Sequence, residues 1–310
     1  MKLIIQPDDG LMPLLKAVRK ARKTIDIVIF RFDRVELEKA LEAAVARGVV
    51  VRALIAHTNR GGEKSLRRLE LRLLDAGVTV SRTADDLPRY HGKLFVVDDV
   101  LYVFGFNYTK LDIEKSRSFG VITADKKLVK EASCLFEADC NRQPYSPRHD
   151  RFVVSPETSR ERLTAFIRGA KKQLLIYDAE VSDNLIHRVL QDRLRAGVEI
   201  RVIGHMDRNL PGVEARPLAD LRLHVRAIVR DGTACLIGSQ SLRKLELDGR
   251  REVGLIVTDA RLASQVRNVF ESDWSASAPA KPAGKEKDKD KDKDKEKEKE
   301  KDATAASVAG

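Results

Sequence analysis

The sequence repeats itself at a constant spacing, and this repeat limits the folds that are open to the chain. Apolar residues at helical spacing within 11–23 recur 149 residues later, and those within 35–47 recur at the same spacing. The matched residues are Leu14, Ala17, Val18 and Ala21 with Leu163, Phe166, Ile167 and Ala170, then Leu37, Ala40, Leu41 and Val45 with Ile186, Val189, Leu190 and Leu194, and the helix-ending Gly48 with Gly197. A spacing shared by two helices indicates an internal duplication.

Each repeat alternates helical and strand patterns. The β-branched, apolar segments 24–30 and 49–55 predict buried strands, and each one follows an amphipathic helix. In the second repeat, 198–203 corresponds to 49–54. The order helix, strand, helix, strand is typical of βαβ units around a sheet, so we expect an α/β fold.

The second repeat is shorter than the first. Beyond the second strand the spacing falls to 133 residues, and the missing piece corresponds to a predicted helix at 65–76. The extra segment 59–86 of the first repeat could shape one side of a pocket. Turn formers and two prolines at 141–147 mark the end of the first repeat. The predicted parts are a first repeat at 1–145, a second repeat at 146–275 and a disordered tail rich in Lys, Asp and Glu at 276–310.

A histidine, a lysine and an aspartate lie together in an apolar segment of the first repeat, as His91-Gly92-Lys93 and Asp98. Alternation along a strand places His91 and Lys93 on the same face. An imidazole beside an ammonium suits an anion that must be both attacked and neutralised. A strand edge with a solvated His and Lys explains the segment equally well when it is taken alone.

The second repeat carries the same pattern at the matching place. His224, Arg226 and Asp231 follow the first motif by 133 residues, and Gly238-Ser239-Gln240-Ser241 comes after them. A doubled H-x-[K/R]-x4-D in a duplicated α/β scaffold resembles the phospholipase D superfamily, whose signature is a doubled H-x-K-x4-D followed by G-S-x-N. The resemblance covers 1–275. It implies two similar α/β-sandwich repeats packed about a pseudo-twofold axis, with the active site at their interface.

The sequence departs from the family pattern in both repeats. In the first, Gly105-Phe106-Asn107 stands for G-S-x-N, one residue shorter and without the Ser, and Asn107 takes the place of the family asparagine. In the second, Arg226 replaces the Lys and Ser241 replaces the Asn. Because Arg226 keeps the positive charge and offers a bidentate fork to phosphate, we expect altered geometry rather than automatic loss of activity.

The resemblance implies a phosphodiesterase that forms a phosphohistidine. One histidine attacks phosphorus, and the other protonates the leaving alkoxide and then activates water. Cationic side chains neutralise the phosphate oxygens, so we expect no metal and no other cofactor. The candidate catalytic residues are His91, Lys93, Asp98, His224, Arg226, Asp231 and Glu252, and the candidate phosphate-binding residues are Lys93, Asn107, Arg226, Ser239 and Ser241. For Asp98 and Asp231, support of the fold as turn acids is favoured over direct chemistry.

An acid that trails the family motif distinguishes the two histidines. It is present in the second repeat as Glu252, and Ser118 stands at its place in the first. In the family, this acid is expected to orient the histidine of the other repeat, so Glu252 would hold His91 and raise its nucleophilicity. His224 would face the weaker Ser118. We therefore predict that His91 is the nucleophile and His224 the general acid.

The composition limits the partners of the chain. The formal charge is +11, and 281–302 hold ten Lys and nine acidic residues, which leaves +10 for the remainder. A basic folded region favours polyanions, phosphorylated substrates or anionic membrane surfaces. The three cysteines form no C-x-x-C pair, so we expect reduced thiols in a cytoplasmic protein. The sequence shows neither a signal peptide nor an apolar run of transmembrane length, so any work on lipid is expected from the surface.

The sequence thus predicts a phosphodiesterase that degrades phospholipids at the head group, with peripheral contact to an anionic membrane surface. One alternative is a metal-independent endonuclease of the same superfamily, which the charge of the region outside the tail favours. Another is a catalytically impaired relative that binds nucleic acid or another anion, which the substitutions in the second motif suggest. The retention of both histidines argues against this last option. Because both motifs lie in one chain, a monomer can complete the site.

Overall fold

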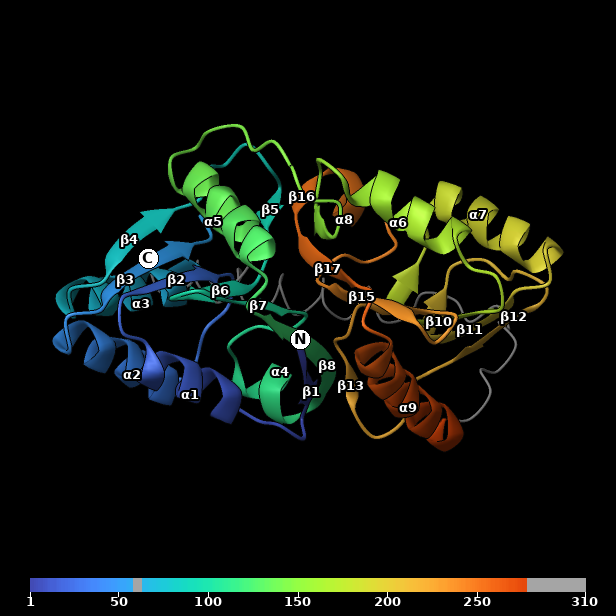
Figure 1. Cartoon of the computed structure of the whole chain (residues 1–310), viewed down its shortest axis with the longest axis horizontal. Helices are drawn as coiled ribbons and strands as arrows, with labels where there is room; N and C mark the ends of the chain where they lie inside the picture. The colour runs from blue at the N-terminus through green and yellow to red at the C-terminus, as the bar shows by residue number, and fades with distance from the viewer. Residues whose placement is uncertain (58–62, 278–310) are drawn as a thin grey trace, which may run out of the picture. The chain divides into compact units, whose positions relative to one another are not determined.

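The computed structural model describes residues 1–57 and 63–277, and it is drawn in Figure 1. These residues form two mixed sheets of similar size, each covered by helices on both faces, which confirms the predicted α/β class with two similar repeats. Residues from 278 onward lie outside the described part of the chain, so the predicted disorder of the tail stays a prediction.

The first sheet contains the first histidine motif. Its strand order is β1-β8-β7-β6-β2-β3-β4, in which β2, β3 and β4 are parallel neighbours and the remaining neighbours are antiparallel. The strands are β1 (Lys2–Gln6), β2 (Thr24–Ile29), β3 (Val50–Ile55), β4 (Thr79–Arg82), β6 (Leu94–Val97), β7 (Val100–Phe104) and β8 (Ser116–Thr123). The helices are α1 (Met12–Lys20), α2 (Val35–Ala46), α3 (Glu63–Asp75), α4 (Lys110–Glu114) and α5 (Lys126–Cys140).

The second sheet contains the second motif. Its order is β12-β11-β10-β14-β15-β17-β9, again with three parallel neighbours, β10, β11 and β12, at one end. The strands are β9 (Phe152–Val154), β10 (Gln173–Val181), β11 (Glu199–Met206), β12 (Val213–Arg216), β14 (Ala227–Arg230), β15 (Ala234–Gly238) and β17 (Val253–Val257). The helices are α6 (Ser159–Arg168), α7 (Asn184–Arg195), α8 (Lys244–Asp248) and α9 (Ala260–Ala276).

The predicted duplication is visible in the arrangement of these elements. In the first repeat, α1 and α2 lie below the sheet in Figure 1 and α5 lies above it. In the second repeat the arrangement is reversed, with α6 and α7 above the sheet and α9 below it. This inversion is what a pseudo-twofold axis between the repeats produces. The first-repeat helix α3 has no counterpart in the described connection between β11 and β12, as the shorter spacing predicted.

Three hydrophobic cores follow from the alternation of apolar residues along the strands. In β2, Ile25, Ile27 and Ile29 face α1 and α2 in a core that belongs to the first repeat. A corresponding core lies under α6 and α7 in the second repeat. The third core lies between the repeats, where α5 and α9 contribute residues such as Leu135 and Phe270. Because both repeats bury apolar surface in this shared core, their interface is part of the folded structure.

Two short parallel pairings join the repeats at the histidine motifs. Strand β5 (Arg89–Tyr90) of the first repeat pairs with β16 (Arg250–Arg251) of the second. Strand β13 (Arg222–Leu223) of the second repeat pairs with β8 of the first. The chain passes from one sheet to the other between Cys140 and Phe152, and the predicted boundary at 145 lies in this connection. Among the described helices, none is long and apolar enough to cross a bilayer.

Candidate active site

Each histidine is held in place by a strand of the other repeat. The backbone N–H of His91 donates to the carbonyl of Arg251 at 2.7 Å, and the N–H of His224 donates to the carbonyl of Arg117 at 3.3 Å. Gly92 next to His91 is required by close approach, because a Cβ there would lie 2.9 Å from Cγ2 of Val253. The two motifs are therefore brought to the interface by equivalent contacts.

Glu252 orients the ring of His91. Its Oε2 lies 2.9 Å and its Oε1 3.1 Å from Nδ1 of His91, and the carboxylate is fully buried. The edge of the ring also packs on Phe30, with 4.5 Å between the ring centroids. A neutral His91 that donates its Nδ1–H to Glu252 keeps the lone pair of Nε2 available. The contact between these two residues, 161 positions apart, is the one that the sequence predicted.

The protonation of this pair follows from its burial. Burial lowers the pKa of His91 well below its usual value, and the nearby charges of Lys93 and Arg226 lower it further. Burial also raises the pKa of Glu252 to about 7, against the opposing effect of Lys93. The imidazole is thus neutral at pH 7, which is the form that a nucleophile needs.

Asp112, which is not among the candidate residues predicted from the sequence, is the acid beside His224. Its Oδ2 lies 3.4 Å from Nδ1 of His224. The prediction that Ser118 faces this ring is wrong, because the Ser118 hydroxyl donates to the backbone carbonyl of His224 at 3.1 Å. Burial lowers the pKa of His224 well below its usual value, and Asp112 opposes this shift. Both histidines therefore have an acid, but Asp112 also accepts hydrogen bonds from Asn107 and Arg222, whereas Glu252 is in direct hydrogen-bond distance of His91.

A second duplicated motif could have revealed Asp112. The residues of α4 read Lys-Leu-Asp-Ile-Glu and those of α8, 134 positions later, read Lys-Leu-Glu-Leu-Asp. The acid at the centre of each motif, Asp112 or Glu246, is buried. A buried acid at the same place in both repeats is a signal for a site residue.

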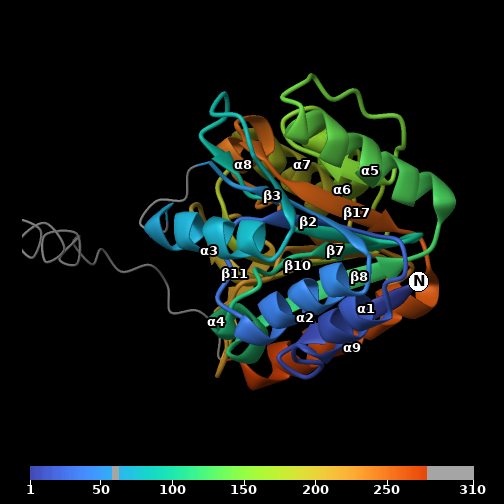
Figure 2. The same ribbon diagram turned by 90° about the vertical axis from the view of Figure 1, so that its left-hand side faces the viewer.

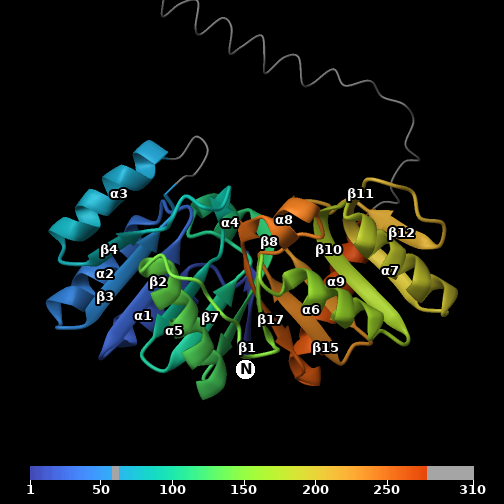
Figure 3. The ribbon, with the colours of Figure 1, turned by 90° about the horizontal axis from the view of Figure 1, so that it is seen from above.

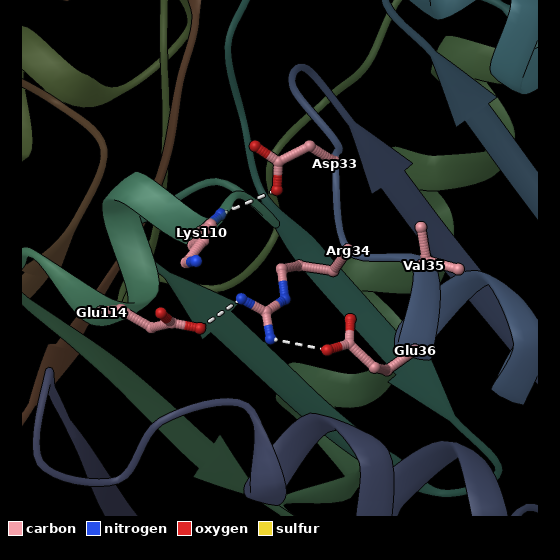
Figure 4. A pocket seen from close by; sticks show the side chains of 6 residues that line it. All are labelled: Asp33, Arg34, Val35, Glu36, Lys110 and Glu114. Atoms are coloured by element: carbon pink, nitrogen blue, oxygen red, sulfur yellow. Dashed lines mark hydrogen bonds and ion pairs between the residues drawn. The ribbon is translucent and has the colours of Figure 1, made fainter.

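Helix α4 is clamped at both ends, which fixes the position of Asp112. The N–H of Lys110 donates to Asp33 at 2.8 Å, and Arg34 forms ion pairs with Glu114 and, at 3.0 Å, with Glu36 (Figure 4). The pocket drawn there has a volume of about 430 Å³ and is lined by Asp33, Arg34, Val35, Glu36, Lys110 and Glu114. None of the candidate catalytic residues lines it, so its contribution to the site is to support α4.

Lys93 and Arg226 supply positive charge to both histidines. Lys93 is fully buried, and its Nζ donates to the carbonyl of His91 at 2.6 Å. Burial lowers the pKa of Lys93 to about 7, although Glu252 opposes this shift. Nε of Arg226 is buried without a hydrogen-bond partner among the described residues, and the nearest acid, Asp178, is 3.8 Å away. Both cations lower the pKa of both histidines, so an anion that reaches the rings also reaches these charges.

The remaining candidate phosphate-binding residues, Asn107, Ser239 and Ser241, form hydrogen bonds within the protein. Asn107 donates from Nδ2 to Asp112 at 2.6 Å, while its buried Oδ1 has no partner in the described part. Ser241 donates to Asp178, an acid that the sequence analysis did not identify. Ser239 accepts a hydrogen bond from the N–H of Val253 at 3.1 Å and donates to the carbonyl of the same residue at 3.3 Å. Ser241 therefore positions an acid, whereas Ser239 is tied to the backbone next to Glu252.

Asp98 and Asp231 are not brought to the histidines. Asp98 lies beyond the far end of β6, about 16 Å of extended chain away from Lys93. Its carboxylate accepts the backbone N–H groups at the start of β2, from Arg22 at 3.0 Å, Lys23 at 2.8 Å and Thr24 at 3.0 Å. Asp231 accepts from Lys171, Lys172 and Gln173 in the same way. The catalytic assignment of these two aspartates therefore lacks support from the geometry, which matches the fold-supporting role.

Replacement of Asp98 by alanine should destabilise the fold without stopping chemistry. We expect the free energy of unfolding to fall by about 2–3 kcal/mol, because three backbone N–H groups lose their acceptor. Burial alone would raise the pKa of Asp98, but these N–H groups outweigh it and the pKa is lowered. The stabilisation is thus complete above the pKa of an unfolded aspartate, about 3.9, and is lost as the pH falls through the lower folded pKa. Urea unfolding at pH 7 and at pH 3 measures both effects, and a thousandfold loss of kcat in the folded variant would contradict the assignment.

Comparison with solved structures shows which known folds the chain resembles. A polyphosphate kinase from Porphyromonas gingivalis matches with a TM-score of 0.73 at 20% identity over 87% of this chain, and the chain spans about half of that protein, 46%. The phosphatidylserine synthase of Haemophilus influenzae matches with a TM-score of 0.67 at 11% identity over 90% of this chain and 87% of its own. Nuc from Salmonella typhimurium, a phospholipase D family member, matches at 21% identity over 47% of this chain and 97% of its own, with a TM-score of 0.41.

A comparison with curated proteins found no match. The sequence model of one family, described as "Cardiolipin synthase, PLD-like domain", matches residues 14–140 and 210–274. These segments include both histidine motifs, Asp112 and Glu252, and they make up more than half of the chain. The chain therefore belongs to this family of phospholipase D-like domains, and with it to the phospholipase D superfamily.

Proposed function

We propose that this protein cleaves or transfers a phosphodiester through a phosphohistidine on His91. The observation that carries the proposal is the hydrogen bond between Nδ1 of His91 and the buried Glu252. It fixes the tautomer in which Nε2 is the free nucleophile, and it stabilises the positive charge that the ring gains when the bond from Nε2 to phosphorus forms.

His224 completes the reaction in this proposal as the general acid. In the attack, the bond from phosphorus to the leaving oxygen breaks, and that oxygen takes a proton from His224. Burial lowers the pKa of His224, so the ring is neutral before a substrate binds. A phosphodiester brings a negative charge next to this ring and raises its proton affinity, with Asp112 adding to the effect. The neutral His224 that remains then accepts a proton from water, whose oxygen releases the phosphoryl group from His91.

Lys93 and Arg226 neutralise the oxygens that do not leave. Both are close enough to affect the pKa of each histidine, and Arg226 has a buried Nε without a partner in the described part. Cationic donors that are fixed before the substrate arrives stabilise the charge of the transition state without reorganisation. Arg226 is therefore a functional replacement for the lysine of the family motif.

Exposed leucines on α4 and α8 favour phospholipid as the substrate. Leu111 is 50% exposed and Leu245 is 46% exposed, and they occupy equivalent places in the two repeats. Each follows an exposed lysine, Lys110 or Lys244, and precedes a buried acid of the site region. The two helices lie on the same side of the fold in Figures 2 and 3. Apolar side chains flanked by cations suit the interface of an anionic bilayer.

Two of the names found by comparison are in keeping with this substrate. The family description refers to cardiolipin synthase, and one similar structure is a phosphatidylserine synthase, so transfer of a phosphatidyl group to an alcohol is included in the proposal beside hydrolysis. The second candidate is cleavage of nucleic acid, which the charge of +10 outside 281–302 favours.

Replacement of both Leu111 and Leu245 by serine should weaken binding to vesicles that contain anionic phospholipid. We expect the partition coefficient to fall about tenfold, because two apolar side chains lose their contact with the acyl boundary. Release of head group from the same vesicles should fall in parallel, while turnover of a water-soluble phosphodiester should stay unchanged. Cosedimentation and a head-group assay, both in the presence of a chelator, measure these quantities.

The matched control replaces Leu71 and Leu74 on α3 by serine. These leucines are 62% and 48% exposed, so the control removes similar apolar surface from another part of the fold. Equal effects of the two double variants would reject a specific role of α4 and α8. Cleavage of single- or double-stranded nucleic acid by the wild-type protein, without activity on vesicles, would favour the second candidate.

A further inference from the structure

Arg89 lies next to His91 in an unusual electrostatic position. It belongs to β5, two residues before His91, and the register of β5 with β16 places it directly beside Arg250. Strand alternation puts Arg89 and His91 on the same face. Like charges at opposed positions of neighbouring strands are destabilising, so this pair needs an explanation.

Several cations gather with His91 around the ring of Phe30. The distance from the ring centroid is 5.5 Å to Cζ of Arg89, 5.7 Å to Cζ of Arg31 and 5.4 Å to Nζ of Lys93. His91 packs edge-on against the same ring. The positive charge therefore lies beside the proposed nucleophile.

Within residues 1–57 and 63–277, no acid forms an ion pair with Arg89. Its counterpart in the second repeat, Arg222, is paired with Asp112 at 2.6 Å. The residue equivalent to Asp112 is Glu246, but its carboxylate is already bound to Arg250, at 2.6 Å, and to Arg243. The duplication thus supplied an acid for each of the two arginines, but Glu246, the acid that corresponds to Arg89, is paired with Arg250 and Arg243 instead. Burial and the charges of Arg250 and Arg31 lower the pKa of Arg89, and the charges of Glu252 and Glu246 oppose this shift without reversing it.

We propose that Arg89, together with Arg250, binds a second anionic group of the substrate beside the phosphate that His91 attacks. The inference rests on the proposed function and narrows its substrate class to a lipid phosphodiester whose head group carries a second phosphate. Because Arg89 and His91 lie on the same face of the strand, the second phosphate would bind beside His91 rather than beside His224. Such an anion would replace the missing acid and offset the repulsion between the two arginines.

The experiment compares two diffusible probes by isothermal titration calorimetry in the presence of a chelator. Inorganic phosphate reports on the site of Lys93 and Arg226, and methylenediphosphonate, which resists hydrolysis, reports on that site and the second position together. We expect the wild-type protein to bind the diphosphonate at least about tenfold more tightly than phosphate. The variant Arg89→Gln should lose this preference and keep its affinity for phosphate. Arg168→Gln, which removes the charge of an exposed arginine on α6, should change neither.

Thermal unfolding of Arg89→Gln separates a binding role from a structural one. Because the substitution removes repulsion, we expect its Tm to stay equal to the wild-type value or to rise. A clear fall in Tm would show that Arg89 serves the fold and would overturn the inference. A wild-type protein that binds the two probes equally, or a preference that survives in Arg89→Gln, would overturn it as well and leave the proposed function intact. Failure of the wild-type protein to bind either probe would reject the proposed function and the inference together.

Discussion

Replacement of His91 by alanine should lower the rate of phosphodiester cleavage by about 10⁴-fold or more. The variant loses the nucleophile, and with it the covalent intermediate that divides the displacement into two easier steps. The loss should be equally large for substrates with poor and with activated leaving groups. A rapid-mixing experiment in the presence of a chelator measures the rate of the first turnover, which later steps do not affect.

His224→Ala should behave differently, because an activated aryl leaving group departs without a proton. We expect its first turnover to be impaired much less with an aryl ester than with an alkyl ester. His205→Ala is the matched control, because His205 lies near the end of β11 and its side chain is exposed. We expect this variant to stay within about twofold of the wild-type rate. If His91→Ala showed the dependence on leaving group and His224→Ala did not, the two roles would have to be exchanged.

Glu252→Gln should lower kcat by about 10³-fold with little change in substrate affinity. The amide keeps the size of the carboxylate but cannot stabilise the positive ring that forms on attack, and it favours the wrong tautomer of His91. It also removes the charge that faces the buried Lys93. Steady-state kinetics on a water-soluble phosphodiester measures kcat and KM separately.

Glu38→Gln is the control for Glu252→Gln, because Glu38 is a buried acid that pairs with Arg72 outside the site. We expect this control to lose stability and keep kcat within a few-fold of the wild-type value. A loss below tenfold for Glu252→Gln, with a larger one for Asp112→Asn, would contradict the assignment of His91 as the nucleophile.

The contact of His91 with Glu252 could be predicted because the resemblance to the superfamily implies it. In that family, the acid that trails the motif of one repeat is expected to orient the histidine of the other repeat. The same reasoning failed for Ser118, since the acid at His224 comes from α4 and not from the equivalent strand. Comparison of the two histidine motifs does not show that α4 reaches His224, because the position of α4 depends on its contacts with Asp33 and Arg34.

The charge pattern around Arg89 could not be predicted from the sequence, for a related reason. Arg89 and Arg250 are 161 residues apart, and only the pairing of β5 with β16 places them side by side. Whether an arginine has a counter-ion depends on which neighbour claims Glu246, and that is decided by side-chain geometry. The roles of Asp98 and Asp231 were easier to predict, since an acid in a turn after a strand commonly accepts backbone N–H groups.

The most direct test of the central claim is to trap the covalent intermediate. The protein is mixed with a phosphodiester substrate, quenched under alkaline conditions that preserve phosphohistidine, and digested with trypsin. Cleavage after Arg and Lys releases His91 within 90–93 and His224 within 223–226, so mass spectrometry separates the two sites. We predict the substrate-derived phosphoryl group on 90–93, and its absence in His91→Ala. The same group on 223–226 of the wild-type protein would contradict the account.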